Sequence, residues 1–276
     1  SKFAADNRWA NFWSATAGWR ISNEEFMKDF DWLNDLKIRF GYGVTGNNDF
    51  SATYMANMLG SDTNWMMPNG TWAYSYGKSQ NVNPNLGWEE KKEWNLGVDY
   101  SFFEGRLYGK FDYYRREVDN LLFSVKVPQP PYTQGSQMQN IGSMESKGWE
   151  FEVGGDIIRT KDFTWSSSMN LSHNTGKILT LEGDNSYHNG NGFVAPGTPG
   201  DAARMEAGST IGSFYMWKFA GFDDEGSFLL YNKDGEVIPA AQKTENDKQY
   251  IGNYTPKLII GWSHTLTYKN LDLGIT

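Results

Sequence analysis

Apolar and polar residues alternate strictly along several segments of this chain. In one of them the apolar positions are Leu36, Ile38, Phe40, Tyr42 and Val44, and the positions between are Lys37, Arg39, Gly41, Gly43 and Thr45. Successive side chains of a β-strand point to opposite faces of a sheet. This pattern therefore predicts a strand with one apolar and one polar face.

The same alternation marks seven other segments, which brings the predicted strands to eight. They cover residues 9–21, 93–102, 107–116, 149–157, 163–172, 258–268 and 271–276. Between two of them the chain reverses tightly through Phe103-Glu104-Gly105-Arg106, as in a β-hairpin. Neighbouring strands are expected to pair in an antiparallel sheet.

The connections between these strands alternate between short and long. The short ones cover 22–34, 104–106, 159–162 and 269–270, and the long ones 47–92, 117–146 and 175–256. Outer-membrane barrels show this asymmetry, because their short turns face the periplasm and their long loops face outward. The predicted fold class is all-β, an antiparallel transmembrane β-barrel with long extracellular loops.

Composition agrees with this fold class and excludes others. The chain is 16% aromatic and contains 30 Gly, yet its mean hydropathy is only -0.62. Alternating strands produce such an average even when one face lies in lipid, whereas no apolar run approaches the length of a membrane-spanning helix. The net charge of -8 argues against nucleic acid as a partner, and the absence of cysteine excludes disulfides.

Large aromatic residues are predicted to form two girdles on the apolar face. Near the long connections lie Trp9, Tyr42, Trp94, Tyr113 and Trp149, and near the short turns lie Trp19, Phe102, Phe163, Trp165 and Tyr268. Aromatic rings favour the membrane interfaces, where an apolar body meets lipid and a polar edge meets headgroups. The alternative is that these residues are simply good strand formers.

The charged residues of the polar face bear on the size of the barrel. Small closed barrels fill their interiors with side chains, whereas this face calls for water or a plug, as in barrels of about 22 strands. We therefore expect about eight strands of a larger barrel. A closed eight-stranded barrel is the alternative.

Several motifs, in order along the chain, resemble the C-terminal barrel of SusC/RagA-type TonB-dependent transporters. They are Leu36 to Asn47 with its Gly-Val-Thr-Gly-Asn ending, Asn83-Pro84-Asn85-Leu86-Gly87-Trp88-Glu89, Trp94 to Tyr100, Asp119-Asn120-Leu121-Leu122, Asn140-Ile141-Gly142-Ser143-Met144, Lys147-Gly148-Trp149-Glu150, and Ile251-Gly252-Asn253 before Pro256-Lys257. Each motif is weak alone, but their order and spacing are specific. The resemblance covers nearly the whole chain.

The resemblance implies TonB-dependent import of an oligomeric nutrient, a glycan or a peptide, across the bacterial outer membrane. A SusD-type surface lipoprotein is the implied partner, with the TonB complex engaging a region outside this sequence. The sequence shows no plug domain, and Ser1 to Asn7 has no signal-peptide character. Because the alternation of residues 271–276 is still running at Thr276, we expect the chain to stop within a strand and residues 1–276 to be a C-terminal part of one barrel domain.

No residue pattern points to catalysis, a metal or another cofactor. His173, His188 and His264 lack metal-ligand spacing. Glu150, Glu152 and Asp156 share one strand face and are interpreted as polar lining rather than as a glycosidase pair. The segment Asn232-Lys233-Asp234-Gly235-Glu236 has part of a calcium-loop pattern, but Asp-Gly is more typical of a hairpin turn.

The first long connection is rich in aromatic residues among Asn, Gly and Ser. Trp65, Trp72, Tyr74 and Tyr76 are candidates for contact with substrate or with a capping lipoprotein, because large amphipathic rings suit both. The alternative is loop-on-loop packing.

Two other functions are left open by the residues alone. A passive porin or structural outer-membrane barrel would lack a plug and energy coupling. A secreted carbohydrate-binding β protein would be soluble without detergent.

Overall fold

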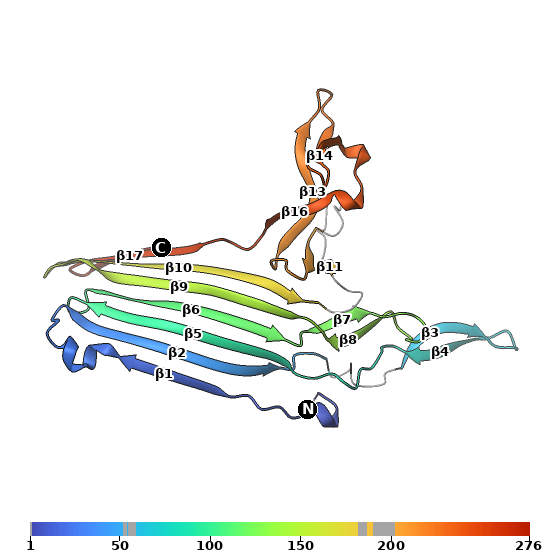
Figure 1. The fold of residues 1–276 in the computed structure, drawn as a ribbon, viewed down its shortest axis with the longest axis horizontal. Helices are drawn as coiled ribbons and strands as arrows, with labels where there is room; N and C mark the ends of the chain where they lie inside the picture. Colours follow the sequence, from blue (N-terminus) through green and yellow to red (C-terminus); the bar gives the residue numbers. More distant parts are fainter. Residues whose placement is uncertain (1, 52–53, 55–58, 182–186, 190–201) are drawn as a thin grey trace.

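The main body of the structure is one antiparallel sheet of eight strands (Figure 1). The computed structural model describes residues 2–51, 54, 59–181, 187–189 and 202–276. The strand order is β1-β2-β5-β6-β9-β10-β17-β18, so each strand pairs with the next long strand along the chain. The bounds are Ser14–Arg20 (β1), Leu33–Asn47 (β2), Glu89–Phe102 (β5), Leu107–Asp119 (β6), Ser143–Arg159 (β9), Phe163–Thr180 (β10), Ile259–Tyr268 (β17) and Leu271–Ile275 (β18). The predicted all-β, antiparallel fold is confirmed.

The remaining strands lie in the three long connections and form small sheets. Their bounds are Leu59–Met66 (β3), Trp72–Lys78 (β4), Leu122–Lys126 (β7), Ser136–Asn140 (β8), Tyr187–Asn189 (β11), Arg204–Glu206 (β12), Ser213–Phe222 (β13), Phe228–Tyr231 (β14), Val237–Pro239 (β15) and Lys248–Asn253 (β16). In Figure 1 these sheets gather at one end of the main sheet, opposite the short turns.

Helical structure is limited to single 3₁₀ turns among the described residues. They are Ala5–Asn7 (η1), Ile21–Asn23 (η2), Glu25–Met27 (η3), Ala240–Gln242 (η5) and Glu245–Asp247 (η6). None of the described helices has the length and hydropathy needed to span a membrane.

β9 and β10 extend farther toward the long connections than their apolar alternation predicts. The outer part of β10 pairs with β9 through Thr175↔Lys147 and Lys177↔Glu145. These outer residues are polar or charged, so the hydrogen-bonded ladder continues after the apolar pattern has stopped. The pattern marks the limit of the apolar face, not the end of the strand.

β1 is shorter than predicted, because it begins at Ser14 and not at Trp9. The last ladder bond before it runs from the Val44 amide to the Trp13 carbonyl, at 2.8 Å. Trp9 has no strand partner there, and its side chain is 88% exposed.

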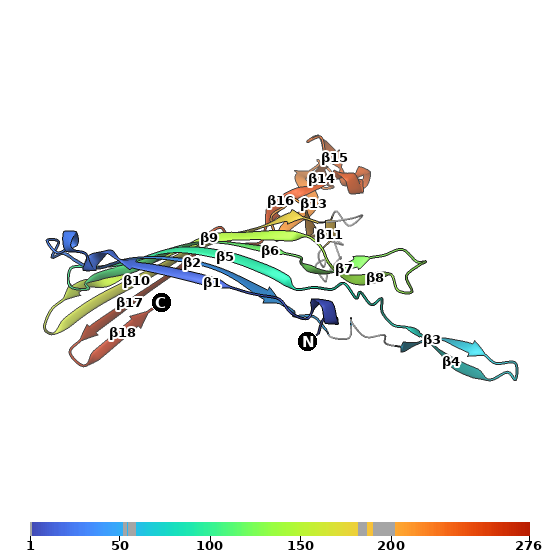
Figure 2. The ribbon, with the colours of Figure 1, turned by 60° about the horizontal axis from the view of Figure 1, so that its bottom comes forward.

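The main sheet is open. Among the described residues, β1 pairs only with β2 and β18 only with β17, so the two edge strands do not meet. Figure 2 shows the sheet curved and twisted. The structure is therefore a curved section of wall, and the closed eight-stranded alternative is wrong for it.

Three glycine–tyrosine pairs lie directly opposite each other across the central strands. Tyr100 faces Gly109, Tyr108 faces Gly154 and Tyr114 faces Gly148. At each pair the tyrosine ring lies over the glycine and occupies the space where a Cβ would lie. Such pairs let an aromatic side chain lie flat on the sheet while the strands remain in register.

The packing of the molecule is unlike that of a soluble domain. The buried cluster of Phe3, Phe50 and Leu86 is formed by the N-terminal segment and the first long connection, and not by strands of the sheet. On the sheet itself, large apolar side chains stay about half exposed, including Phe40, Leu96, Ile260, Trp262 and Leu273. A contiguous apolar surface of this extent marks an interaction with lipid or protein.

Gly148→Val is expected to lower the free energy of unfolding of the full-length protein by about 1–3 kcal/mol. A Cβ there would collide with the carbonyl of His173 and with the Tyr114 ring. Gly41→Val is the matched control, because it lies on the same polar face and its Cβ would be 3.6 Å from Thr16. Denaturant unfolding in detergent measures both, and equal losses would contradict the role given to the tyrosine–glycine pair.

Candidate functional site: a two-faced wall with projecting arms

One face of the sheet is apolar across all eight strands. The register aligns apolar residues in rows that cross the sheet. One row consists of Ala17, Phe40, Leu96, Tyr113 and Trp149. The next row consists of Ala15, Tyr42 and Trp94. On β5 the apolar stretch runs from Trp94 to Phe102, which is about the 9–11 residues that a strand needs to cross a bilayer. The arrangement can present an apolar band to lipid.

Four of the five aromatic residues predicted near the long connections come together. Tyr42 pairs with Trp94, Tyr113 pairs with Trp149, and the Trp94 and Tyr113 rings are 5.4 Å apart. Trp9 is not part of this row, because it precedes β1. The alternation places Trp13 on the same apolar face but not in the predicted girdle, and in the structure its ring is 5.1 Å from that of Tyr42.

The aromatic residues predicted near the short turns form smaller groups. Phe163 and Tyr268 are direct cross-strand partners. Trp165 lies on β10 opposite Leu266, and the indole of Trp19 donates to Glu24 at 2.9 Å.

Phe102 contacts an aromatic residue that the alternation did not reveal. Its ring centroid is 5.6 Å from that of Trp32. Trp32 lies in the connection before β2, outside any alternating segment, so the sequence pattern held no signal for it.

A band of charged residues bounds the apolar face beyond the long-connection aromatics. Arg115 and Lys147 share the face with Trp94 and both pair with Glu145, at 2.6 and 3.5 Å. Lys92 pairs with Asp119 at 2.7 Å. Charged side chains are costly at the centre of a bilayer but tolerated at its interface. The band therefore sets the outer limit of any lipid contact.

The opposite face is polar and held by ion pairs. Arg39 on β2 donates to Asp99 on β5 at 2.8 Å and to Asp112 on β6 at 3.1 Å, and thereby connects three strands. Lys110 and Glu152 form a further pair at 3.1 Å. Charge-assisted bonds of this kind fix strand register as well as adding stability.

The carboxylates considered for catalysis have structural partners. Glu152 pairs with Lys110, and Asp156 accepts a hydrogen bond from the Ser166 hydroxyl at 2.7 Å. Glu150 lies on the same polar face, directly opposite Asp112 on β6 and Ser172 on β10. The three are part of the polar lining.

The three histidines lie apart in the described structure. The ring of His173 contacts the Lys257 carbonyl, at 2.5 Å. His264 accepts from the Trp165 indole at 3.3 Å and lies on the apolar face. His188 belongs to β11, and its side chain is outside the described residues. No group of three His, Cys, Asp or Glu suited to a metal is found in the part of the chain that the structure describes.

The segment Asn232 to Glu236 is the hairpin turn between β14 and β15. The Asn232 side-chain oxygen accepts from the backbone amides of Asp234 and Glu236, at 3.0 and 2.8 Å. Gly235 has a φ of 84°, which a glycine adopts without strain. The side-chain oxygen is thus used within the turn.

Asparagine side chains join the first two long connections, at the motifs that carried the resemblance. Asn140 exchanges two bonds with the backbone of Gly87, at 2.7 and 2.9 Å, and also donates to the Asn120 carbonyl. Asn81 bonds to backbone atoms of residues 133–136. Leu86 is fully buried below them. These bonds therefore fix the geometry of the two connections.

The four loop aromatics lie on the β3–β4 hairpin, the hairpin arm, which projects away from the sheet (Figure 2). Trp72, Tyr74 and Tyr76 share one face, and all are about 70% exposed. Trp65 pairs with Ala73 and lies on the other face. An isolated two-stranded hairpin is marginally stable, so an exposed aromatic face on one suits contact with another molecule.

A second arm is formed by β13 to β16 and stands on the outer end of β10 (Figure 1). Backbone bonds between 176–178 and 208–211 hold its base. Phe219, Phe222 and Phe228 form an exposed cluster at its tip, with ring centroids 5.1 to 5.9 Å apart. Sequence reasoning missed this cluster, because a turn separates Phe228 on β14 from Phe219 and Phe222 on β13.

Two titratable groups of the second arm have pKa values that differ from their ordinary ones. Hydrogen bonds from the Thr244 hydroxyl and amide, which cap η6, lower the pKa of Asp247. Burial, with a hydrogen bond to Glu206, raises the pKa of Tyr250 to about 12. Both groups are bonded within the arm and help to hold it together.

Comparisons with known proteins agree on one family. The family described as TonB dependent receptor-like, beta-barrel, matches residues 1–276. The chain is 33% identical over 288 residues to the TonB-dependent receptor SusC of Bacteroides thetaiotaomicron, covering 100% of this chain and 28% of SusC. It is 32% identical to the TonB-dependent receptor P3 of Formosa agariphila, with 100% and 28% covered.

Solved structures give the same result. The structure of the RagAB peptide transporter superposes with a TM-score of 0.82 at 28% identity, over 99% of this chain and 29% of that one. The RagAB peptide importer in its open-open state gives the same values. These relatives are receptors and transporters, which confirms the SusC/RagA-type resemblance and the prediction that the chain is not an enzyme. The chain spans less than a third of their length.

Arg39→Gln is expected to destabilise the full-length protein by about 1–3 kcal/mol, because two partly buried carboxylates lose their shared partner. Lys110→Gln is the control, since its single, more exposed pair contributes less than about 1 kcal/mol. Unfolding in urea measures both variants. A smaller loss for Arg39→Gln than for Lys110→Gln would refute the bridging role.

Proposed function

This chain belongs to the TonB-dependent receptor-like β-barrel family, and from that membership we propose that it forms part of the wall and loops of a nutrient importer of the bacterial outer membrane. Members of the family are outer-membrane β-barrels that serve in nutrient import. The observation that carries the proposal is the exposed apolar face, bounded by aromatic and then by charged residues. A soluble carbohydrate-binding protein has no use for such a face.

We propose that the apolar face contacts lipid and that the Arg39 face lines the interior. The short turns would then face the periplasm, and the connections near 47–92, 117–146 and 175–256 would be extracellular. The two aromatic rows would lie at the two membrane interfaces, as the girdles of transmembrane barrels do. The whole barrel, of about 22 strands, would include a plug outside this chain.

The proposed cargo is an oligomeric nutrient, a glycan or a peptide, and the proposed partners are a SusD-type lipoprotein and the TonB complex. The relatives include SusC and the RagAB peptide importer, whose names support import driven through TonB. Family membership favours this over a passive porin. The TonB complex would act on a region outside these residues.

Cysteine labelling in intact cells tests the orientation, because the chain has no cysteine of its own. Asp224→Cys, in the β13–β14 turn, is expected to react with a membrane-impermeant maleimide. Lys161→Cys, in the β9–β10 turn, should react only after the cells are permeabilised. Labelling of Lys161→Cys in intact cells would overturn the orientation.

The hairpin arm is proposed to contact the lipoprotein or the cargo through one face. Removing Trp72, Tyr74 and Tyr76 together, each to Ala, should weaken lipoprotein binding or cargo uptake about tenfold or more, as loss of aromatic anchors does. Trp65→Ala, on the other face, should change neither by more than about twofold. Pull-down of the lipoprotein and growth on the cargo measure the two effects. Equal losses for both variants would show that the arm acts only through its folding.

A further inference from the structure

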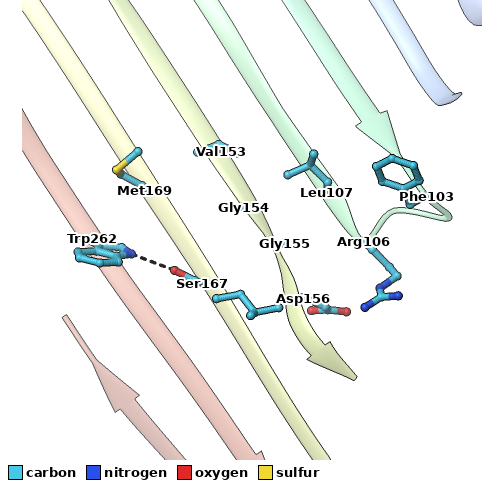
Figure 3. A pocket seen from close by; sticks show the side chains of 11 residues that line it. Phe103, Arg106, Leu107, Val153, Gly154, Gly155, Asp156, Ser167, Met169 and Trp262 are labelled. Atoms are coloured by element: carbon cyan, nitrogen blue, oxygen red, sulfur yellow. Dashed lines mark hydrogen bonds between the residues drawn. The ribbon is translucent and has the colours of Figure 1, made fainter. Parts of the chain in front are cut away.

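A hollow lies in the apolar face near the short turns (Figure 3). We call it the turn-end hollow, and its volume is about 510 Å³, within the range of sites for small molecules. Its walls and floor on the apolar face are Leu107, Val153, Gly155, Ser167, Met169 and Trp262. Phe103 and Arg106, from the β5–β6 turn, stand at one side of it, and the Arg106 side chain extends toward Asp156.

The register explains why the face is hollow at this place. Gly155 on β9 pairs directly with Ser167 on β10, so two small residues lie side by side. The next row outward, Val153, Met169 and Trp262, is large and forms a wall. A register shift between Trp165 and Ser166 places Ile157 at the other side of the floor. The hollow is thus built into the strand pairing.

The polar groups of the hollow are few and specific. The Trp262 indole donates to the Ser167 hydroxyl oxygen at 2.9 Å, which leaves the hydroxyl proton to be donated. Asp156 already accepts from Ser166 and lies 3.6 Å from the Arg159 guanidinium. The described ion pairs do not include Arg106, whose exposed guanidinium stands at the rim.

We propose that the turn-end hollow binds one glycerophospholipid from the leaflet on the short-turn side. An acyl chain fills the apolar floor, an ester carbonyl accepts from Ser167, and the phosphate lies against Arg106. A guanidinium is the side chain best suited to a phosphate. The inference rests on the proposed function, since it requires the apolar face to lie in lipid.

Native mass spectrometry of the full-length protein, stripped in detergent and then mixed with a defined phosphatidylethanolamine, tests this site. Ser167→Leu fills the hollow with a side chain that lipid tolerates, and Arg106→Gln removes the charge. Each should lower the bound fraction about tenfold, Arg106→Gln because a bond to a charged group is lost and Ser167→Leu because the acyl chain loses its space. A diacylglycerol with the same chains should bind weakly and without dependence on Arg106.

The controls lie on the same face and in the same set of turns. Ala17→Leu enlarges the apolar face elsewhere, and Lys161→Gln removes a positive charge from the β9–β10 turn outside the hollow, so neither should change lipid binding. Equal binding in all four variants would overturn the site. So would a change of oligomeric state in Ser167→Leu without loss of lipid, which would assign the hollow to a second copy of the chain. In either case the protein would still be found in the outer membrane, whereas failure of the proposed function would remove it from there.

Discussion

The backbone hydrogen-bond ladder between sequential antiparallel strands is the constraint on which the rest of the structure depends. In lipid, no water can satisfy an exposed amide or carbonyl, so a wall built of strands must pair every one of them with a neighbour. The unbroken order from β1 to β18 meets this requirement for all inner strands. Once the ladder is fixed, alternation assigns each side chain to a face, and the two faces can be given opposite chemistry without altering the backbone.

The two faces contribute to the wall in different ways. The polar face adds specific bonds, of which Arg39 with Asp99 and Asp112 connects three strands and defines their register. The apolar face adds few contacts of its own, since its side chains remain about half exposed. With the proposed lipid contact, its stabilisation would come from the surroundings, because lipid removes the cost that water imposes on exposed apolar side chains. The same sheet is therefore poorly suited to water and well suited to a membrane.

Sequence reasoning predicted the wall well, because alternation with period two is a local signal. All eight strands and their antiparallel pairing follow from it. It predicted the ends less well. Trp9 was expected in β1 because it continues the alternation that includes Trp13. Alternation alone does not reveal that strand pairing begins only at Ser14. The outer part of β10 was missed for the opposite reason, since Lys177 pairs with Glu145 without an apolar face.

The parts of the structure that alternation could not predict depend on contacts between residues far apart in the sequence. The glycine at 155 and the serine at 167 look unremarkable in sequence, and only the register places them side by side to form the turn-end hollow. The second arm likewise depends on backbone bonds from residues 208–211 to the outer end of β10. A wall needs only local alternation, whereas a site needs two or three strands in a particular register. The sites proposed for this chain therefore lie where the alternation is interrupted: at the small residues within the apolar face and in the arms beyond the strand ends.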